Sequence, residues 1–179
     1  RPHLVLVGPM GAGKTSIGRR LAERMALAFV DSDREIETQA GAPVAMIFAC
    51  EGEAGFRARE RAAIASALAG TGCVLATGGG AVLDAGTRAL LRREAFVVHL
   101  HVDVDGQLQR LARDRVRPLL RDMDDAGRRD ALERLATERG PLYADVADLR
   151  FDTAGLAPGD AAERLVLALR ERWPRGAAA

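Results

Sequence analysis

The sequence Gly8-Pro9-Met10-Gly11-Ala12-Gly13-Lys14-Thr15 fits the phosphate-loop pattern G-x-x-x-x-G-K-[ST]. Lys14 is the only lysine in the chain, although lysine and arginine together number 26. In this pattern a compact, flexible ammonium group reaches the phosphates of a nucleotide, and a planar guanidinium does not replace it. The one position that carries lysine is therefore the one where phosphate chemistry requires it.

The residues on either side of this loop supply the context that the pattern needs. Leu4–Val7 is a short apolar run, typical of a buried parallel strand. Ile17, Leu21 and Met25 recur at helical spacing after the loop, which predicts a helix with one apolar face. Backbone N–H groups at the start of that helix would converge on an anion. The residues expected to bind the phosphates are Gly11, Ala12, Gly13, Lys14, Thr15 and Ser16.

Length and composition indicate one domain spanning residues 1–179. The chain is 48% hydrophobic, carries a net charge of +1 and contains only seven aromatic residues (five Phe, one Tyr, one Trp). This argues against a nucleic-acid partner, because there is neither a basic surplus nor a base-stacking surface. Cys50 and Cys73 cannot form a disulfide framework or a C-x-x-C metal pair. With no signal peptide or apolar span in the sequence, we expect a monomeric cytoplasmic protein without a membrane partner.

Strand-like runs alternate with helical patterns along the chain, which predicts an α/β fold with a parallel sheet covered on both faces. The predicted strands are Leu4–Val7, Leu27–Asp31, Cys73–Thr77, Ala95–His101 and Asp148–Asp152. Ligands in such folds bind beyond the carboxyl ends of the strands. The first three strands end in the phosphate loop, in Asp31-Ser32-Asp33 and in Thr77-Gly78-Gly79-Gly80. We expect these three clusters to face one cleft.

Three further segments have predicted roles. Residues 32–62 are expected to form a helical insertion that carries part of a substrate pocket, with helix breaks at Gly41-Ala42-Pro43 and Glu51-Gly52-Glu53. Residues 113–125 alternate in charge between two helical patterns; they are either a solvated connection or, as we favour, a lid that excludes water. Residues 174–179 are expected to be a frayed tail.

Candidate catalytic groups follow from the requirements of phosphoryl transfer. Lys14 and the loop amides would hold the phosphates, and the Thr15 hydroxyl would bind Mg²⁺. Asp31 would steady the ion through water, and Asp33, two residues along an extended segment, would project to the same side and act on a substrate hydroxyl. The alternative is that Asp31 or Ser32 caps the following helix, which would explain only one of the two carboxylates.

Arg57, Arg117 and Arg139 stand out among the arginines because each lies beside an expected helix break. From there a guanidinium could reach into a cleft and bind a carboxylate through two hydrogen bonds. In general, however, an arginine is a solvated surface residue. These three gain significance only from the wider pattern of motifs.

Taken in order, six motifs resemble those of the shikimate kinase family. They are Gly8-Pro9-Met10-Gly11-Ala12-Gly13-Lys14-Thr15-Ser16-Ile17-Gly18, Asp31-Ser32-Asp33, Gly52-Glu53 with Phe56-Arg57 and Glu60, Thr77-Gly78-Gly79-Gly80-Ala81-Val82, Arg117-Pro118-Leu119-Leu120 and Arg139-Gly140-Pro141-Leu142-Tyr143. The resemblance runs from about Leu4 to Leu169. It implies a P-loop NTPase of the nucleoside-monophosphate-kinase type, a three-layer sandwich with a lid and a five-stranded parallel sheet of order 2-3-1-4-5. It also implies that ATP phosphorylates the 3-hydroxyl of shikimate, giving shikimate 3-phosphate and ADP in the pathway to the aromatic amino acids.

The resemblance also implies roles for individual residues. Asp33 would contact the shikimate hydroxyls and act as the base, and Glu60 would hold Arg57 in place. Arg117 would act on the transferring phosphate from the lid, and Arg110 would pack against adenine. The residues expected to bind shikimate are Asp33, Arg57, Gly78, Gly79, Gly80 and Arg139.

Two departures from the family pattern are present, and other functions stay open. The phosphate loop ends in Lys-Thr-Ser instead of the common Lys-Ser-Thr, and the turn Asp152–Pro158 carries no basic side chain to contact adenine. The chain could instead phosphorylate gluconate or a nucleoside monophosphate. It could also be a non-catalytic, kinase-like domain that senses a ligand.

Overall fold

The computed structural model describes residues 1–112 and 123–173. Its centre is a five-stranded sheet in the order β2-β3-β1-β4-β5, in which every neighbouring pair is parallel. The strands are β1 (His3–Val7), β2 (Ala28–Asp31), β3 (Cys73–Ala76), β4 (Ala95–His101) and β5 (Leu149–Asp152). The sequence-predicted strands and their order are confirmed, and no strand end differs by more than one residue.

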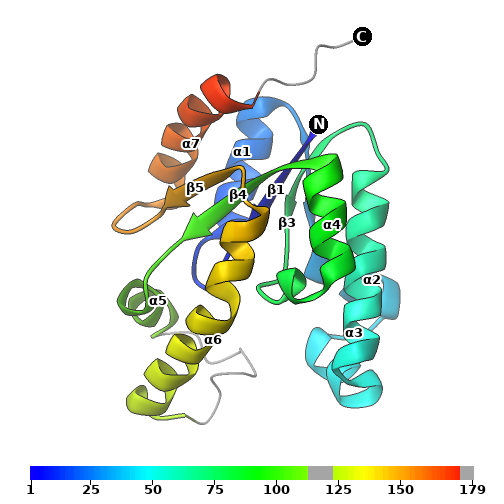
Figure 1. Cartoon of the computed structure of the whole chain (residues 1–179), viewed down its shortest axis with the longest axis vertical. Helices are drawn as coiled ribbons and strands as arrows, with labels where there is room; N and C mark the ends of the chain where they lie inside the picture. The colour runs from blue at the N-terminus through cyan, green and yellow to red at the C-terminus, as the bar shows by residue number, and fades with distance from the viewer. Residues whose placement is uncertain (113–122, 174–179) are drawn as a thin grey trace.

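Helices cover both faces of the sheet, so the molecule has three layers (Figure 1). The helices are α1 (Lys14–Met25), α2 (Ser32–Ala40), α3 (Val44–Leu68), α4 (Ala85–Glu94), α5 (Val104–Leu111), α6 (Asp125–Val146) and α7 (Pro158–Arg172), with a short 3-10 turn η1 (Ala81–Leu83). Among the described residues, no helix is long and apolar enough to cross a membrane.

The alternation of side chains along β1 explains the two cores. Leu4 and Leu6 are completely buried in the cluster that contains α1 and α7. Val5 and Val7 are equally buried in the opposite cluster, against α3, α4 and α6. Because a central parallel strand is covered on both sides, it must be apolar at consecutive positions, as Leu4–Val7 is.

The segment between β2 and β3 consists of two helices that pack on each other through Ile36, Ile47 and Phe56. The predicted breaks are both present: Gly41 ends α2 in the left-handed conformation, and Gly52 interrupts α3 with φ 70° and ψ −176°. After Gly52 the helix continues to Leu68 and joins the sheet core. This turn in α3 directs the residues from Phe56 to Glu60 towards the ends of the strands.

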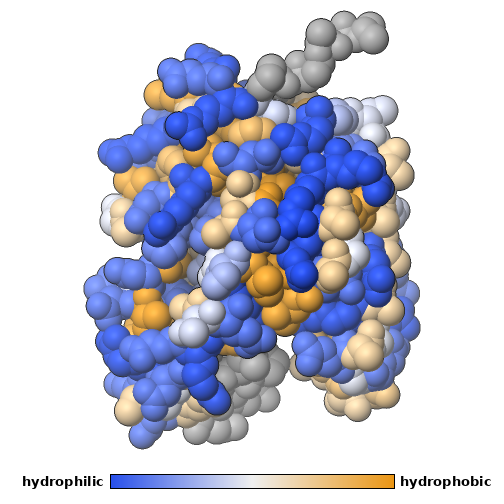
Figure 2. All heavy atoms as spheres, in the orientation of Figure 1, coloured by the Kyte–Doolittle hydropathy of each residue, from blue (hydrophilic) through white to orange (hydrophobic). Residues whose placement is uncertain are grey.

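The view in Figure 2 shows a largely hydrophilic surface with small scattered hydrophobic patches. In this view the lower edge shows a notch beside the part of the molecule that carries α2 and α3. The notch lies at the end of the sheet to which the carboxyl ends of the strands point, where ligands bind in open parallel sheets.

Candidate active site

A cleft of about 940 Å³ opens beyond the carboxyl ends of β1, β2 and β3. Its lining includes the phosphate loop, the Asp31 and Asp33 carboxyl groups and the three glycines after β3, so the predicted convergence of these clusters is confirmed. The volume is near the upper end of the range for small-molecule sites, which gives room for two reactants side by side.

Hydrogen bonds from Gln107 of α5 and from Lys14 of α1 hold the phosphate loop in place. Gly13, at the N-cap of α1, has φ 89°, a left-handed conformation that glycine adopts without steric cost. The Gln107 side chain of α5 donates a hydrogen bond to the Met10 carbonyl (2.9 Å). Lys14 Nζ donates to the carbonyls of Gly8 (2.8 Å) and Pro9 (2.9 Å), so its ammonium already lies over the loop. The first-turn amides of α1 complete an anion-binding end.

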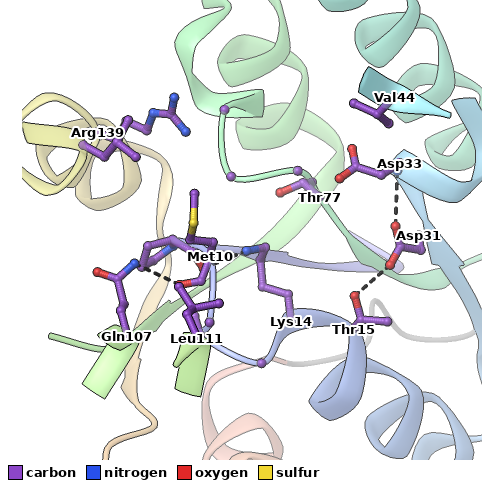
Figure 3. A pocket seen from close by; sticks show the side chains of 18 of the residues that line it. Met10, Lys14, Thr15, Asp31, Asp33, Val44, Thr77, Gln107, Leu111 and Arg139 are labelled. Atoms are coloured by element: carbon purple, nitrogen blue, oxygen red, sulfur yellow. Dashed lines mark hydrogen bonds between the residues drawn. The ribbon is translucent and has the colours of Figure 1, made fainter. Parts of the chain in front are cut away.

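Asp31 joins the phosphate loop to the next strand. Its Oδ2 accepts a hydrogen bond from the Thr15 hydroxyl (2.8 Å), and its Oδ1 accepts from the backbone N–H groups of Asp33 (3.2 Å) and Arg34 (3.4 Å) (Figure 3). The helix-capping role that we ranked second is therefore present, in addition to the contact with the phosphate loop. Oδ2 contacts the phosphate loop and Oδ1 caps the helix, because both oxygens of a carboxylate can accept hydrogen bonds.

Asp33 lies in the first turn of α2, and not on the extended segment that we expected. The chain turns into the helix directly after Asp31 because that residue caps it. The Asp33 side chain nevertheless faces the cleft (Figure 3). Its Oδ1 is buried and accepts no hydrogen bond from the described residues. Burial, and then the negative charge of Asp31, raise the pKa of this carboxyl above its usual value.

Arg57 and Glu60 form an ion pair on α3 beside Asp33. Arg57 Nη1 lies 2.5 Å from Glu60 Oε2, and Glu60 is only 1% exposed. The remaining oxygen, Oε1, is buried and has no hydrogen-bond partner among the described residues. Burial raises the pKa of Glu60, while the Arg57 charge opposes that rise. The guanidinium also lies over the Phe56 ring, 5.4 Å from its centroid.

Two of the three glycines after β3, Gly78 and Gly80, have no space for a side chain. A Cβ at Gly78 would lie 2.7 Å from Glu60 Oε1 and 2.9 Å from Asp33 Oδ1, and a Cβ at Gly80 would lie 2.2 Å from Arg57 Nη2. The side chains of Asp33, Arg57 and Glu60 therefore lie close to the backbone of Gly78 and Gly80. The Gly78 N–H also donates to the Ser32 hydroxyl (3.2 Å), which ties the glycines to α2.

Arg139 reaches the cleft from α6, on the side opposite Asp33 (Figure 3). We expected it beside a helix break, and this was wrong: α6 runs through Pro141 to Val146 without a break. Proline removes one backbone donor but its φ suits a helix, so surrounding packing can keep the helix continuous. Tyr143, one turn further along, donates from its hydroxyl to the Gly79 carbonyl (2.5 Å).

Arg110 lines the cleft near the phosphate loop, but its guanidinium is engaged with the protein. It donates to the carbonyls of Gly11 (2.7 Å) and Thr153 (2.5 Å) and to the Thr153 hydroxyl (2.9 Å). It thus joins the loop to the turn after β5, where Leu156 and Pro158 also line the cleft. Arg117 lies outside the described residues, as does most of the predicted 113–125 lid, and so does the 174–179 tail.

Comparison with known proteins decides the family. The family model described as shikimate kinase matches residues 10–170. The chain belongs to the shikimate kinase family. A curated shikimate kinase of Stenotrophomonas maltophilia (strain K279a) is 53% identical over 174 residues, covering 97% of this chain and 95% of that protein. One from Xanthomonas campestris pv. campestris (strain 8004) is 51% identical, covering 96% and 94%.

A solved structure of this family has the same fold. The shikimate kinase from Acinetobacter baumannii in complex with shikimate has a TM-score of 0.88 and 42% identity, covering 97% of this chain and 96% of that one. The resemblance stated from six motifs is therefore confirmed by similarity over nearly the whole chain.

Several residues that build the site were not singled out from the sequence. Gln107 and Thr153 act through side-chain hydrogen bonds to backbone carbonyls distant in the chain, and no local pattern marks such contacts. Ser32 was considered only as a possible helix cap, and its hydrogen bond with the Gly78 N–H was not expected. Tyr143 was noted only as part of a motif. Its spacing of four residues from Arg139, which places both on one helix face, could have indicated a shared role.

Proposed function

We propose that this chain catalyses transfer of the terminal phosphoryl group of ATP to the 3-hydroxyl of shikimate. The observation that carries the proposal is a wall made of Asp33, Arg57, Arg139 and the glycines 78–80, facing the phosphate loop across one cleft. Two guanidinium groups and a carboxylate suit a small acid that carries one carboxylate and several hydroxyls. The phosphate loop on one side of the cleft and this wall on the other belong to a single chain, so we also propose that one copy suffices for activity.

The nucleotide would bind along the phosphate loop. The loop amides and Lys14 would hold the β- and γ-phosphates, as the pattern requires. Arg110 would lie against adenine with the face of its guanidinium, since its N–H groups are directed to Gly11 and Thr153. Arg117 would act on the transferring phosphate, a role that rests on the resemblance alone.

Oxygen atoms suited to Mg²⁺ are present beside the loop. The Thr15 hydroxyl and the Asp31 carboxylate lie 2.8 Å apart in the cleft, and hard oxygen donors are what this ion prefers. Thr15 would bind the ion directly and Asp31 would hold it through water. When bound, the ion would neutralise charge on the phosphates.

The acceptor would bind against the glycine wall. Arg57 and Arg139 would hold its carboxylate, and Asp33 would accept the proton of the attacking hydroxyl on its buried Oδ1. Because burial raises the pKa of Asp33, the carboxylate is a stronger base than one in water. Enclosure by the two walls would orient the hydroxyl and limit access of water.

The test is release of ADP from ATP with three candidate acceptors, shikimate, gluconate and CMP, each with and without Mg²⁺. We expect turnover with shikimate that depends on Mg²⁺ and little with the other two. Turnover with gluconate or CMP but not with shikimate would remove the assignment. Absence of turnover with all three, together with measurable binding of shikimate, would favour the ligand-sensing alternative.

Two variants test the residue roles in the same assay. Lys14→Ala and Asp33→Ala should each reduce kcat by roughly two to four orders of magnitude, because they remove a charge that acts on the transferring group or its acceptor. Circular dichroism should show that both variants stay folded. Wild-type turnover in either variant would refute the role given to that residue.

A further inference from the structure

The glycines 78–80 that line the cleft are contacted from α6 by Tyr143. This residue is 3% exposed and lies in the last third of α6. Its ring packs against the His99 ring of β4, with centroids 5.1 Å apart, and its hydroxyl donates to the Gly79 carbonyl (2.5 Å). Burial raises the pKa of Tyr143 to about 12, so the hydroxyl keeps the proton that it donates.

The other glycine carbonyls of this wall are satisfied locally. Gly78 accepts from the Ala81 N–H (3.2 Å) and Gly80 accepts from the Leu83 N–H (3.0 Å), both within the 3-10 turn that follows. For Gly79, by contrast, the hydrogen bond found among the described residues comes from Tyr143 on a distant helix. Tyr143 therefore fixes the Gly79 carbonyl, whereas the 3-10 turn fixes those of Gly78 and Gly80.

A peptide unit is planar, so holding one of its atoms orients the others. The Gly79 carbonyl and the Gly80 N–H belong to the same unit, and in a trans peptide they point in opposite directions. Glycine alone would leave this unit free to rotate, because it lacks the side chain that restricts φ and ψ. The hydrogen bond from Tyr143 thus sets the direction of the Gly80 N–H, and Gly80 lines the cleft.

Arg139 lies on the same side of the glycine segment as this hydroxyl. The positive charge of Arg139 lowers the pKa of Tyr143, against the larger effect of burial. A Cβ at Gly79 would lie 3.7 Å from the Tyr143 hydroxyl and 3.8 Å from Arg139 Nη1, so both side chains border this glycine. Arg139 Nε is itself buried without a hydrogen-bond partner among the described residues.

We infer that Tyr143 is a positioning residue for the acceptor, which orients the Gly79–Gly80 peptide through its hydroxyl group. The inference rests on the proposed function for the identity of the acceptor. Tyr143 acts on acceptor affinity and leaves the nucleotide side of the cleft unchanged. His99 supports the ring from behind.

The test compares Tyr143→Phe, which removes only the hydroxyl, with Trp173→Phe as a matched control. Trp173 also donates from a buried ring to a backbone carbonyl, that of Arg1 (2.9 Å), but at the opposite end of the sheet. Tyr143→Phe should raise the KM and the calorimetric Kd for shikimate by about 5–10-fold, the worth of one hydrogen bond. Its kcat and its KM for ATP should stay within about twofold of wild type. Trp173→Phe should change none of these constants.

Amide exchange measured without substrate provides a readout that does not depend on turnover. In Tyr143→Phe the Gly80 amide should exchange faster and shift its NMR resonance, while amides of the phosphate loop stay unchanged. An unaltered Gly80 amide, an unaltered Kd, or an equal loss of ADP affinity would overturn the inference. If the wild-type enzyme does not phosphorylate shikimate, the function proposed above fails, whereas the exchange experiment still decides the role of Tyr143.

Discussion

At the scale of single residues, two buried carboxyl oxygens lie at the acceptor wall, the name that we give to Asp33, Arg57, Arg139 and the glycines 78–80, which we propose bind the acceptor. Asp33 Oδ1 and Glu60 Oε1 are both buried, and neither accepts a hydrogen bond from the described residues. Both lie within 3 Å of the position that a Cβ of Gly78 would occupy. Two buried carboxyl groups so close together destabilise the folded protein, which is common where a site must bind a polar ligand.

Asp33→Asn should therefore make the protein more stable while it removes activity. Because burial and the Asp31 charge raise the pKa of Asp33 above 3.8, the ionised carboxylate costs free energy in the folded state. That cost is present above the folded-state pKa and fades as the pH falls through it. Thermal melts should show a higher Tm for the variant at pH 7, by roughly 2–4 °C for each kcal/mol added to the free energy of unfolding. The increase in Tm should be smaller towards pH 4. A lower Tm at pH 7 would contradict this.

Gly80→Ala should weaken acceptor binding without unfolding the protein. The added methyl would lie 2.2 Å from Arg57 Nη2, so the guanidinium must move away from the wall. The backbone needs no change, because Gly80 has φ −96° and ψ 0°. Steady-state kinetics should show an increase of about tenfold or more in the KM for shikimate and little change in that for ATP. Gly70→Ala is the control, because a Cβ at Gly70 would lie 3.7 Å from its nearest neighbour, the Ala67 carbonyl oxygen.

At the scale of elements, the turn in α3 determines where Arg57 points. Gly52 has φ 70° and ψ −176°, a region that is essentially restricted to glycine. A Cβ there would meet nothing within 4 Å, so any effect of a substitution comes from the backbone alone. The two halves of α3 can differ in direction only because this residue permits it.

Gly52→Ala is therefore expected to cost roughly 1–3 kcal/mol of stability and to raise the KM for shikimate. Gly41→Ala is the matched control, since Gly41 also has a positive φ and open space but ends α2 instead of directing Arg57. It should cost about 1 kcal/mol and leave the KM unchanged. Urea denaturation measures the loss of stability, and steady-state kinetics measure the KM for shikimate. Equal KM values in the two variants would show that the turn does not position Arg57.

The elements were predictable from the sequence to different degrees, for physical reasons. The strands, the phosphate loop and the breaks at Gly41 and Gly52 were recognisable because apolar runs and glycines act locally. The helical position of Asp33 was missed, since it depends on Asp31 capping α2. The continuity of α6 through Pro141 was missed as well, because tertiary packing outweighs a local helix breaker.

At the scale of the whole molecule, the two walls of the cleft should bind their ligands separately. The phosphate loop belongs to the β1–α1 junction, whereas the acceptor wall draws on α2, α3, α6 and the glycines after β3. Each ligand that binds only the folded protein stabilises it, by about 2.7 kcal/mol at a concentration 100 times its Kd.

Thermal shift measurements can separate the two walls. ADP with Mg²⁺ and shikimate should each raise the Tm of the wild-type protein. Arg57→Ala should lose the shift with shikimate and keep that with ADP, and Lys14→Ala should do the reverse. Loss of both shifts in either variant would mean that the walls do not bind independently.

Lys14 has a practical consequence that concerns labelling. Its ε-amine is the only lysine amine in the sequence, and it lies across the carbonyls of Gly8 and Pro9 inside the cleft. An amine-selective acylating reagent would therefore mark one side chain, apart from the chain's amino terminus. The mass of the intact protein would then report directly whether a nucleotide shields that amine, with no need for mutagenesis or digestion.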